Sequence, residues 1–108
     1  MPDIEIREGV VLHEDGSATV TLFEPIDLGH ERLEAIHLRR PRVKDMLDID
    51  ARKIDDCDYG VVAKFVSRLS GVPVSTIHEF DVGDFLTAVG TAKGLLKRSS
   101  RRAQRPPV

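Results

Sequence analysis

Histidines have the widest chemical repertoire in this chain, because imidazole can act as a base, an acid or a metal ligand. The four stand at positions 13, 30, 37 and 78, and no two are spaced i, i+4 as paired ligands on one helix face would be. A zinc site would also require Cys57, the single cysteine, at a characteristic spacing from several histidines, and none occurs. The histidines therefore predict neither a metal centre nor a nucleophile with its base.

Aspartates gather between positions 48 and 58 and resemble a cation site in composition. An EF-hand loop requires a glycine at its sixth position and a closing glutamate at its twelfth, and this segment has neither. Solvated helix ends and helix caps account for these aspartates instead. The glycines are dispersed and form no phosphate-binding loop. We therefore predict a protein that is not an enzyme and has no catalytic residues, metal or cofactor.

Charge is distributed unevenly along the 108 residues. Five of the 16 Lys and Arg residues follow position 96, and no acidic residue follows Asp84. Residues 1–96 therefore contain 11 basic and 18 acidic side chains, a net charge of −7. An acidic body repels a phosphate backbone, so nucleic acid, if bound at all, would contact the basic tail. The tail cations are Lys97, Arg98, Arg101, Arg102 and Arg105.

The length and composition fit one folded domain, with 41% hydrophobic and 31% charged residues. Four Phe, one Tyr and no Trp are too few for a surface that stacks single-stranded nucleic acid. The N-terminus lacks the features of a secretory signal, and no apolar run is long enough to cross a membrane. We expect a cytoplasmic protein with a single α+β domain over 1–96 and a disordered basic tail over 97–108.

The first 40 residues predict β-strands. Two runs rich in β-branched and apolar residues, 10–12 and 18–23, flank a turn that contains Asp15 and Gly16. Asp-Gly between two such runs is typical of a hairpin with a type I′ turn, in which both central residues have positive φ. The sequence therefore predicts an antiparallel hairpin at this point.

The alternation of side chains predicts which face of the strands is buried. Val20 and Leu22 share one face of the second strand, and Ile36 and Leu38 share one face of a third. Pro25 is expected to end the second strand because it has no amide donor. The result is an antiparallel meander of about three strands between residues 4 and 38.

Beyond Pro41 the apolar residues recur with a helical period, and we expect about three helices over 41–96. Val43, Met46, Leu47 and Ile54 fall on one stripe and predict the first helix. The second is preceded by capping aspartates and ends at Gly71 and Pro73. Its apolar stripe contains Tyr59, Val62, Phe65, Val66 and Leu69.

A third helix is predicted from about Val82 to Leu96, with Asp81 as its cap. Its expected inner face consists of Val82, Phe85, Leu86, Val89 and Leu96. The meander and these helices together define an α+β fold.

Four segments follow one another in an order that resembles a known family. Residues 19–26 end in Pro-Ile, and residues 36–46 contain Leu-Arg-Arg-Pro with an aspartate four residues after the proline. A predicted helix over 61–69 then closes at Gly-Val-Pro, and residues 77–84 precede an apolar helix. This order resembles the tail assembly chaperone family of Mu-like and related long-tailed bacteriophages. The resemblance covers about residues 19–90, and the first strand and the basic tail lie outside it.

The resemblance implies a non-enzymatic chaperone that binds the tape measure protein and keeps it soluble while the tail tube assembles around it. Such a protein acts in the host cytoplasm and is absent from the mature virion. The resemblance is also compatible with a homo-oligomer and with a frameshift-extended form of the chain. Two other hypotheses remain open: a structural tail component, and a small nucleic-acid-binding regulator that uses Arg98, Arg101, Arg102 and Arg105.

For a chaperone, amphipathic helices offer an apolar groove to a partner helix. The candidate groove residues are Phe65, Leu69, Phe85, Leu86 and Val89. The competing interpretation places each of them in the core. The resemblance also matches Arg39 and Asp45 to an Arg and an Asp of the family pattern, and we expect these two to form a structural ion pair between the end of a strand and the first helix.

Overall fold

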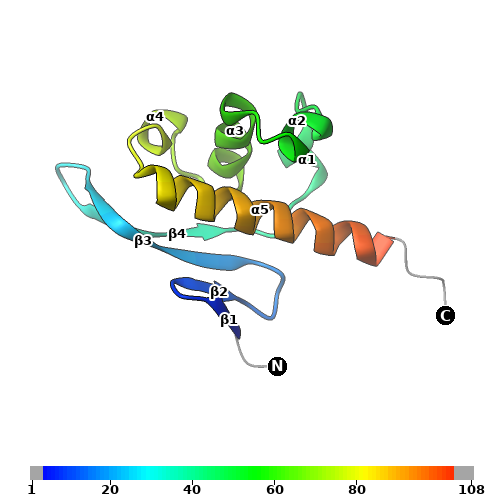
Figure 1. Cartoon of the computed structure of the whole chain (residues 1–108), viewed down its shortest axis with the longest axis horizontal. Helices are drawn as coiled ribbons and strands as arrows, with labels where there is room; N and C mark the ends of the chain where they lie inside the picture. Colours follow the sequence, from blue (N-terminus) through cyan, green and yellow to red (C-terminus); the bar gives the residue numbers. More distant parts are fainter. Residues whose placement is uncertain (1–3, 104–108) are drawn as a thin grey trace.

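Four antiparallel strands form one sheet in the order β1-β2-β3-β4 (Figure 1). The structure is a computed structural model that describes residues 4–103. The strands are β1 (Ile4–Arg7), β2 (Val10–Leu12), β3 (Ala18–Asp27) and β4 (Arg32–Leu38). The predicted meander is confirmed, with β1 as an additional edge strand. β1 lies within the predicted span 4–38 but is not one of the three strands identified there, and all its residues are exposed.

Rows of apolar side chains cross the inner face of the sheet. Val10 pairs with Val20, and Val20 pairs in turn with Ile36. These three residues, together with Leu22 and Leu38, are at most 4% exposed. The predicted inner face is therefore confirmed, because alternation buries every second residue from Ala18 to Leu22 in β3 and from Ile36 to Leu38 in β4.

The loop between β2 and β3 differs from the predicted type I′ turn. Gly16 has a φ of +90°, whereas Asp15 has no positive φ. The Gly16 amide donates to the His13 carbonyl at 3.1 Å, and the His13 amide donates to the Ser17 carbonyl at 2.9 Å. This is the pattern of a three-residue loop with one left-handed glycine. The Asp15 carboxylate favours it by accepting hydrogen bonds from the hydroxyl and the amide of Ser17.

Pro25 does not end β3, contrary to expectation. The strand continues to Asp27, while its pairing with β4 becomes irregular between Thr21 and Ile26. Pro25 lies inside this irregular stretch, where a residue without an amide donor is tolerated. Because the pairing with β4 is interrupted here, backbone amides of β3 between Thr21 and Ile26 are available to another acceptor.

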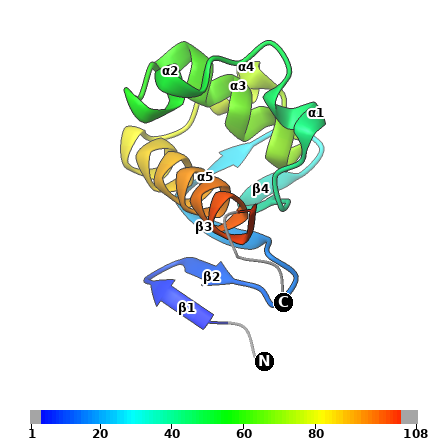
Figure 2. The same ribbon diagram turned by 90° about the vertical axis from the view of Figure 1, so that its right-hand side faces the viewer.

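Helices cover one face of the sheet. They are α1 (Val43–Met46), α2 (Ala51–Asp55), α3 (Tyr59–Ser70), α4 (Val74–Ile77) and α5 (Val82–Ala103). The helix α5 lies along β3, α3 contacts both α5 and β4, and the three short helices pack on α3. Figure 2 shows β1 and β2 extending away from the helical layer. No helix within residues 4–103 has the length and apolar character needed to cross a bilayer.

The single helix predicted after Pro41 is wrong, because two short helices occupy that segment. Asp48, with a φ of +64°, interrupts the helical path between α1 and α2. Val43 and Leu47 are 79% and 57% exposed, so the predicted stripe does not face the core. Of its members only Ile54 is fully buried.

The boundaries of α3 are those that the sequence predicts. The Asp58 carboxylate accepts from the Val61 amide at its start, and Gly71 ends it with a φ of +75°. Four of the five predicted stripe residues are buried in the core. The exception is Tyr59, which is 63% exposed at the first turn.

The last helix starts as predicted and ends later. The Asp81 carboxylate accepts from the amides of Gly83 and Asp84. The helix then continues past Leu96 to Ala103, seven residues beyond its predicted end. The disorder expected for 104–108 falls outside the described residues.

The inner face of α5 also differs from the prediction. Val82 and Leu86 are 67% and 44% exposed, and Phe85 and Leu96 are half-buried. The apolar residues that α5 buries are Ala88, Val89, Ala92 and Leu95.

Candidate protein-binding site

Three of the five predicted groove residues lie in the hydrophobic core. Phe65, Leu69 and Val89 are 1%, 0% and 3% exposed, so they have no surface to offer a partner. The groove prediction is therefore wrong for these three, and the competing interpretation as core residues holds. Phe85 and Leu86 remain accessible near the start of α5.

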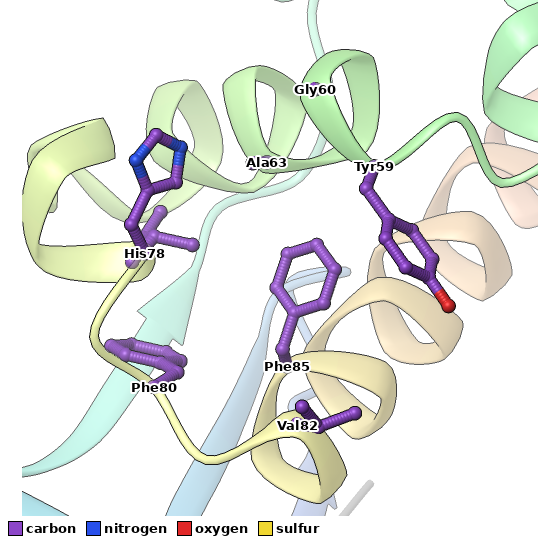
Figure 3. A pocket seen from close by; sticks show the side chains of 8 residues that line it. Tyr59, Gly60, Ala63, His78, Phe80, Val82 and Phe85 are labelled. Atoms are coloured by element: carbon purple, nitrogen blue, oxygen red, sulfur yellow. The ribbon is translucent and has the colours of Figure 1, made fainter.

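A pocket of about 270 Å³ opens beside Phe85, between α3, α4 and the first turns of α5 (Figure 3). We call it the α3–α5 pocket. Its lining is mostly apolar and comes from the beginning of α3, the end of α4 and the beginning of α5. The lining residues are Tyr59, Gly60, Ala63, Ile77, His78, Phe80, Val82 and Phe85.

Two aromatic rings shape one side of the pocket. The rings of Tyr59 and Phe85 meet edge to face, with centroids 5.9 Å apart and an interplanar angle of 87°. In Figure 3 Phe85 projects from α5 toward α3, and Tyr59 lies beside it. This contact joins the first turns of α3 and α5. It leaves apolar surface of both helices accessible at the pocket.

The opposite wall of the pocket is almost bare backbone. Gly60 and Ala63 lie one turn apart on α3 and contribute no long side chain. A Cβ on Gly60 would meet only the Asp58 carboxylate, at 3.6 Å. The slot between α3 and α5 therefore has room for a side chain from another molecule. Sequence reasoning missed it, since Tyr59 and Val82 were assigned to core stripes and Gly60 and Ala63 carried no chemistry.

The structure pairs Arg39 with Asp45. Arg39 Nη2 lies 2.6 Å from Asp45 Oδ1, and Arg39 also donates to the Arg68 carbonyl at 2.7 Å. The second carboxylate oxygen accepts from the Arg42 amide at 2.8 Å and completes a capping box for α1. The pair thus connects the end of β4 to α1 and α3. It is a structural contact and lies apart from the α3–α5 pocket.

The buried carboxyl of Asp45, only 2% exposed, has a lowered pKa. Burial by itself would raise the pKa. The hydrogen bonds from Arg39 and from the Arg42 amide, with the charges of Arg39 and Lys44, outweigh that effect. Asp45 therefore remains ionised within the fold.

Asp84 makes a structural contact that sequence reasoning did not anticipate. Its side chain is buried at the start of α5 and accepts from the amides of Phe23 and Glu24, at 2.8 and 3.0 Å. These amides belong to the irregular stretch of β3, where the ladder to β4 is interrupted. The carboxylate therefore replaces missing strand partners and fixes the start of α5 against the sheet.

Two histidines that are distant in sequence meet on the outer face of the sheet. His13 and His37 both contact the Thr19 hydroxyl, at 2.7 and 3.4 Å, and their rings are 5.7 Å apart. Residues 4–103 contain no group of three or more His, Cys, Asp or Glu side chains that could hold a metal ion. The pair is accounted for by hydrogen bonding across neighbouring strands.

The basic residues at the end of the chain are displayed along α5. Lys97, Arg98 and Arg101 are exposed on its last turns. The side chain of Arg102 and the whole of Arg105 fall outside the described part of the chain. The described tail cations are therefore helical surface residues near the end of α5, whereas the α3–α5 pocket lies at its start.

These features define a small α+β domain whose accessible apolar site lies between two helices. The family model described as "Phage tail assembly chaperone proteins, E, or 41 or 14" matches residues 19–97. The chain therefore belongs to the phage tail assembly chaperone family, and the resemblance seen in the sequence is confirmed. No curated protein and no solved structure matches the chain. Membership of this family implies protein partners in tail assembly.

Proposed function

We propose that this chain is a tail assembly chaperone that binds the tape measure protein and keeps it soluble while the tail tube forms around it. It acts in the host cytoplasm, without catalysis, and leaves before the virion is complete. The observation that carries this proposal is the accessible α3–α5 pocket on a chain of the tail assembly chaperone family.

The pocket fits a helical client in its shape and chemistry. Amphipathic helices bind in apolar grooves through side chains repeated at helical spacing. Tyr59 and Val82, 63% and 67% exposed, provide apolar surface beside the slot that Gly60 leaves open. A large apolar side chain of the client would fill this slot, while its neighbours contact the two exposed residues.

The variant Gly60→Leu should abolish capture of the tape measure protein. Its side chain would grow into the slot and occupy the space of the client side chain. The fold should tolerate it, because the added Cβ meets no backbone and leucine favours helices more than glycine. The measurement is co-expression of this chain with the tape measure protein of the same phage, followed by co-purification.

Two controls accompany this experiment. Gly60→Ala should raise the free energy of unfolding by about 0.5–1 kcal/mol and leave capture intact. Val43→Glu alters an exposed apolar residue on α1, near the far end of α3, and should also leave capture intact. If wild type captures the client and Gly60→Leu captures it equally well, the pocket is not the binding site.

The other hypotheses predict different results. A regulator that binds nucleic acid through the α5 cations should lose affinity steeply with salt and should fail without residues 97–108. A structural tail component should be present in purified particles. The chaperone should tolerate removal of residues 97–108 and be absent from particles. No contact in residues 4–103 favours either alternative, and oligomers or a frameshifted form remain predictions.

A further inference from the structure

The α3–α5 pocket has a strongly acidic surrounding. The segments that contain its lining residues and their immediate neighbours, 58–64 and 77–85, hold four carboxylates and one ammonium group, that of Lys64. One carboxylate, Asp84, turns toward β3 and is used there. The other three are exposed and belong to Asp58, Glu79 and Asp81.

Contacts place two of these carboxylates next to the opening. The Asp58 carboxylate lies 3.6 Å from the Cβ position of Gly60, which lines the pocket. Asp81 stands between the lining residues Phe80 and Val82 in the sequence. Its carboxylate accepts a hydrogen bond from the Gly83 amide at 3.0 Å. Glu79 stands between the lining residues His78 and Phe80. Apolar walls are therefore bordered by negative charge from both α3 and α5.

We infer that the segment bound in this pocket is a basic amphipathic helix: an apolar stripe that enters the slot, flanked by lysine or arginine. The inference rests on the proposed function and specifies the chemistry of the client segment. Charge complementarity across an interface selects partners and speeds association more than it adds contact energy. An acidic helix with the same apolar stripe would be repelled by the carboxylates of Asp58, Glu79 and Asp81.

The test uses two fluorescent model peptides with identical leucine stripes, one with lysines and one with glutamates on the polar face. Binding to the full chain is measured by anisotropy at low and high salt. We expect the lysine peptide to bind at least about tenfold more tightly at low salt, with the difference shrinking as salt screens the charges. Gly60→Leu should abolish its binding at either salt concentration.

The decisive variant removes the three negative charges beside the pocket and keeps the size of each side chain. It combines Asp58→Asn, Glu79→Gln and Asp81→Asn. Asparagine retains the oxygen that caps each helix, so the variant should fold. It should lose most of the preference for the lysine peptide. The matched control, Glu5→Gln, Glu8→Gln and Glu14→Gln, removes three exposed charges around β1 and β2 and should retain the preference.

The inference is wrong if the two peptides bind equally well or if neither binds. It is also wrong if the triple variant at Asp58, Glu79 and Asp81 keeps the preference for the lysine peptide, or if the control variant loses that preference equally. Another result would assign the pocket to a second copy of the chain, namely equally tight binding of a peptide with the sequence of residues 95–105. Capture of the tape measure protein in co-expression reports on the proposed function separately. A chain that captures this client but shows no charge preference therefore loses only the present inference.

Discussion

Asp84→Ala should destabilise the fold by about 2–4 kcal/mol, because it removes a charged acceptor from two backbone amides at once. Those amides, of Phe23 and Glu24, lie where β3 has no regular partner in β4. No neighbouring strand can replace the carboxylate. The helix start would also lose its fixed position on the sheet.

Urea denaturation monitored by circular dichroism measures this loss. Glu34→Ala is a suitable control, since Glu34 only forms an exposed pair with Arg32 at 3.8 Å. That variant should change the free energy of unfolding by less than about 1 kcal/mol. If Asp84→Ala is as stable as the control, the contact with β3 does not stabilise the fold.

Asp45→Ala should have the second large effect, a loss of about 2–3 kcal/mol. Removing one member of a buried ion pair generally costs about 3–5 kcal/mol. The Arg39 side chain is 39% exposed, so water can solvate the abandoned guanidinium and reduce the loss. The variant also removes the acceptor for the Arg42 amide at the start of α1. The same denaturation experiment measures the effect.

The contribution of Asp45 should depend on pH. Its pKa in the fold is lowered, relative to about 3.9 in an unfolded chain. A carboxyl whose pKa is lowered by folding stabilises the fold fully when the pH is above its pKa in the unfolded chain. This contribution is lost as the pH falls through its pKa in the folded protein. The difference in unfolding free energy between wild type and Asp45→Ala should therefore shrink between pH 6 and pH 3. If this difference in unfolding free energy stays constant with pH, the ionised pair of Arg39 and Asp45 does not account for the stability.

Local patterns predicted the strand faces and the boundaries of α3, because those depend on alternation and on caps within a few residues. The buried side chains of Val20 and Ile36 and the left-handed Gly71 followed from such rules. The break at Asp48 and the continuation of β3 through Pro25 did not. Both depend on tertiary partners that no local window contains.

The candidate site was predicted only in part, for a related reason. Helical spacing identifies an apolar face but does not say how far that face turns toward the sheet. In α5 the contact of Asp84 with β3 holds the start of the helix, and Ala88 and Ala92 lie on its buried face. Val82 and Leu86 therefore become accessible while Val89 is buried. A pocket whose wall is made by Gly60 leaves no apolar signal in a sequence.

The buried carboxylate at the start of α5 also gives this protein an internal reporter. Amide protons of Phe23 and Glu24 can exchange with solvent deuterium only when Asp84 withdraws, since each is bonded to its side chain. Val82 and Phe85, which line the pocket, lie within one turn of Asp84. The exchange rates of two strand amides should therefore follow the motion of the helix start, and slow down when a client holds it in place.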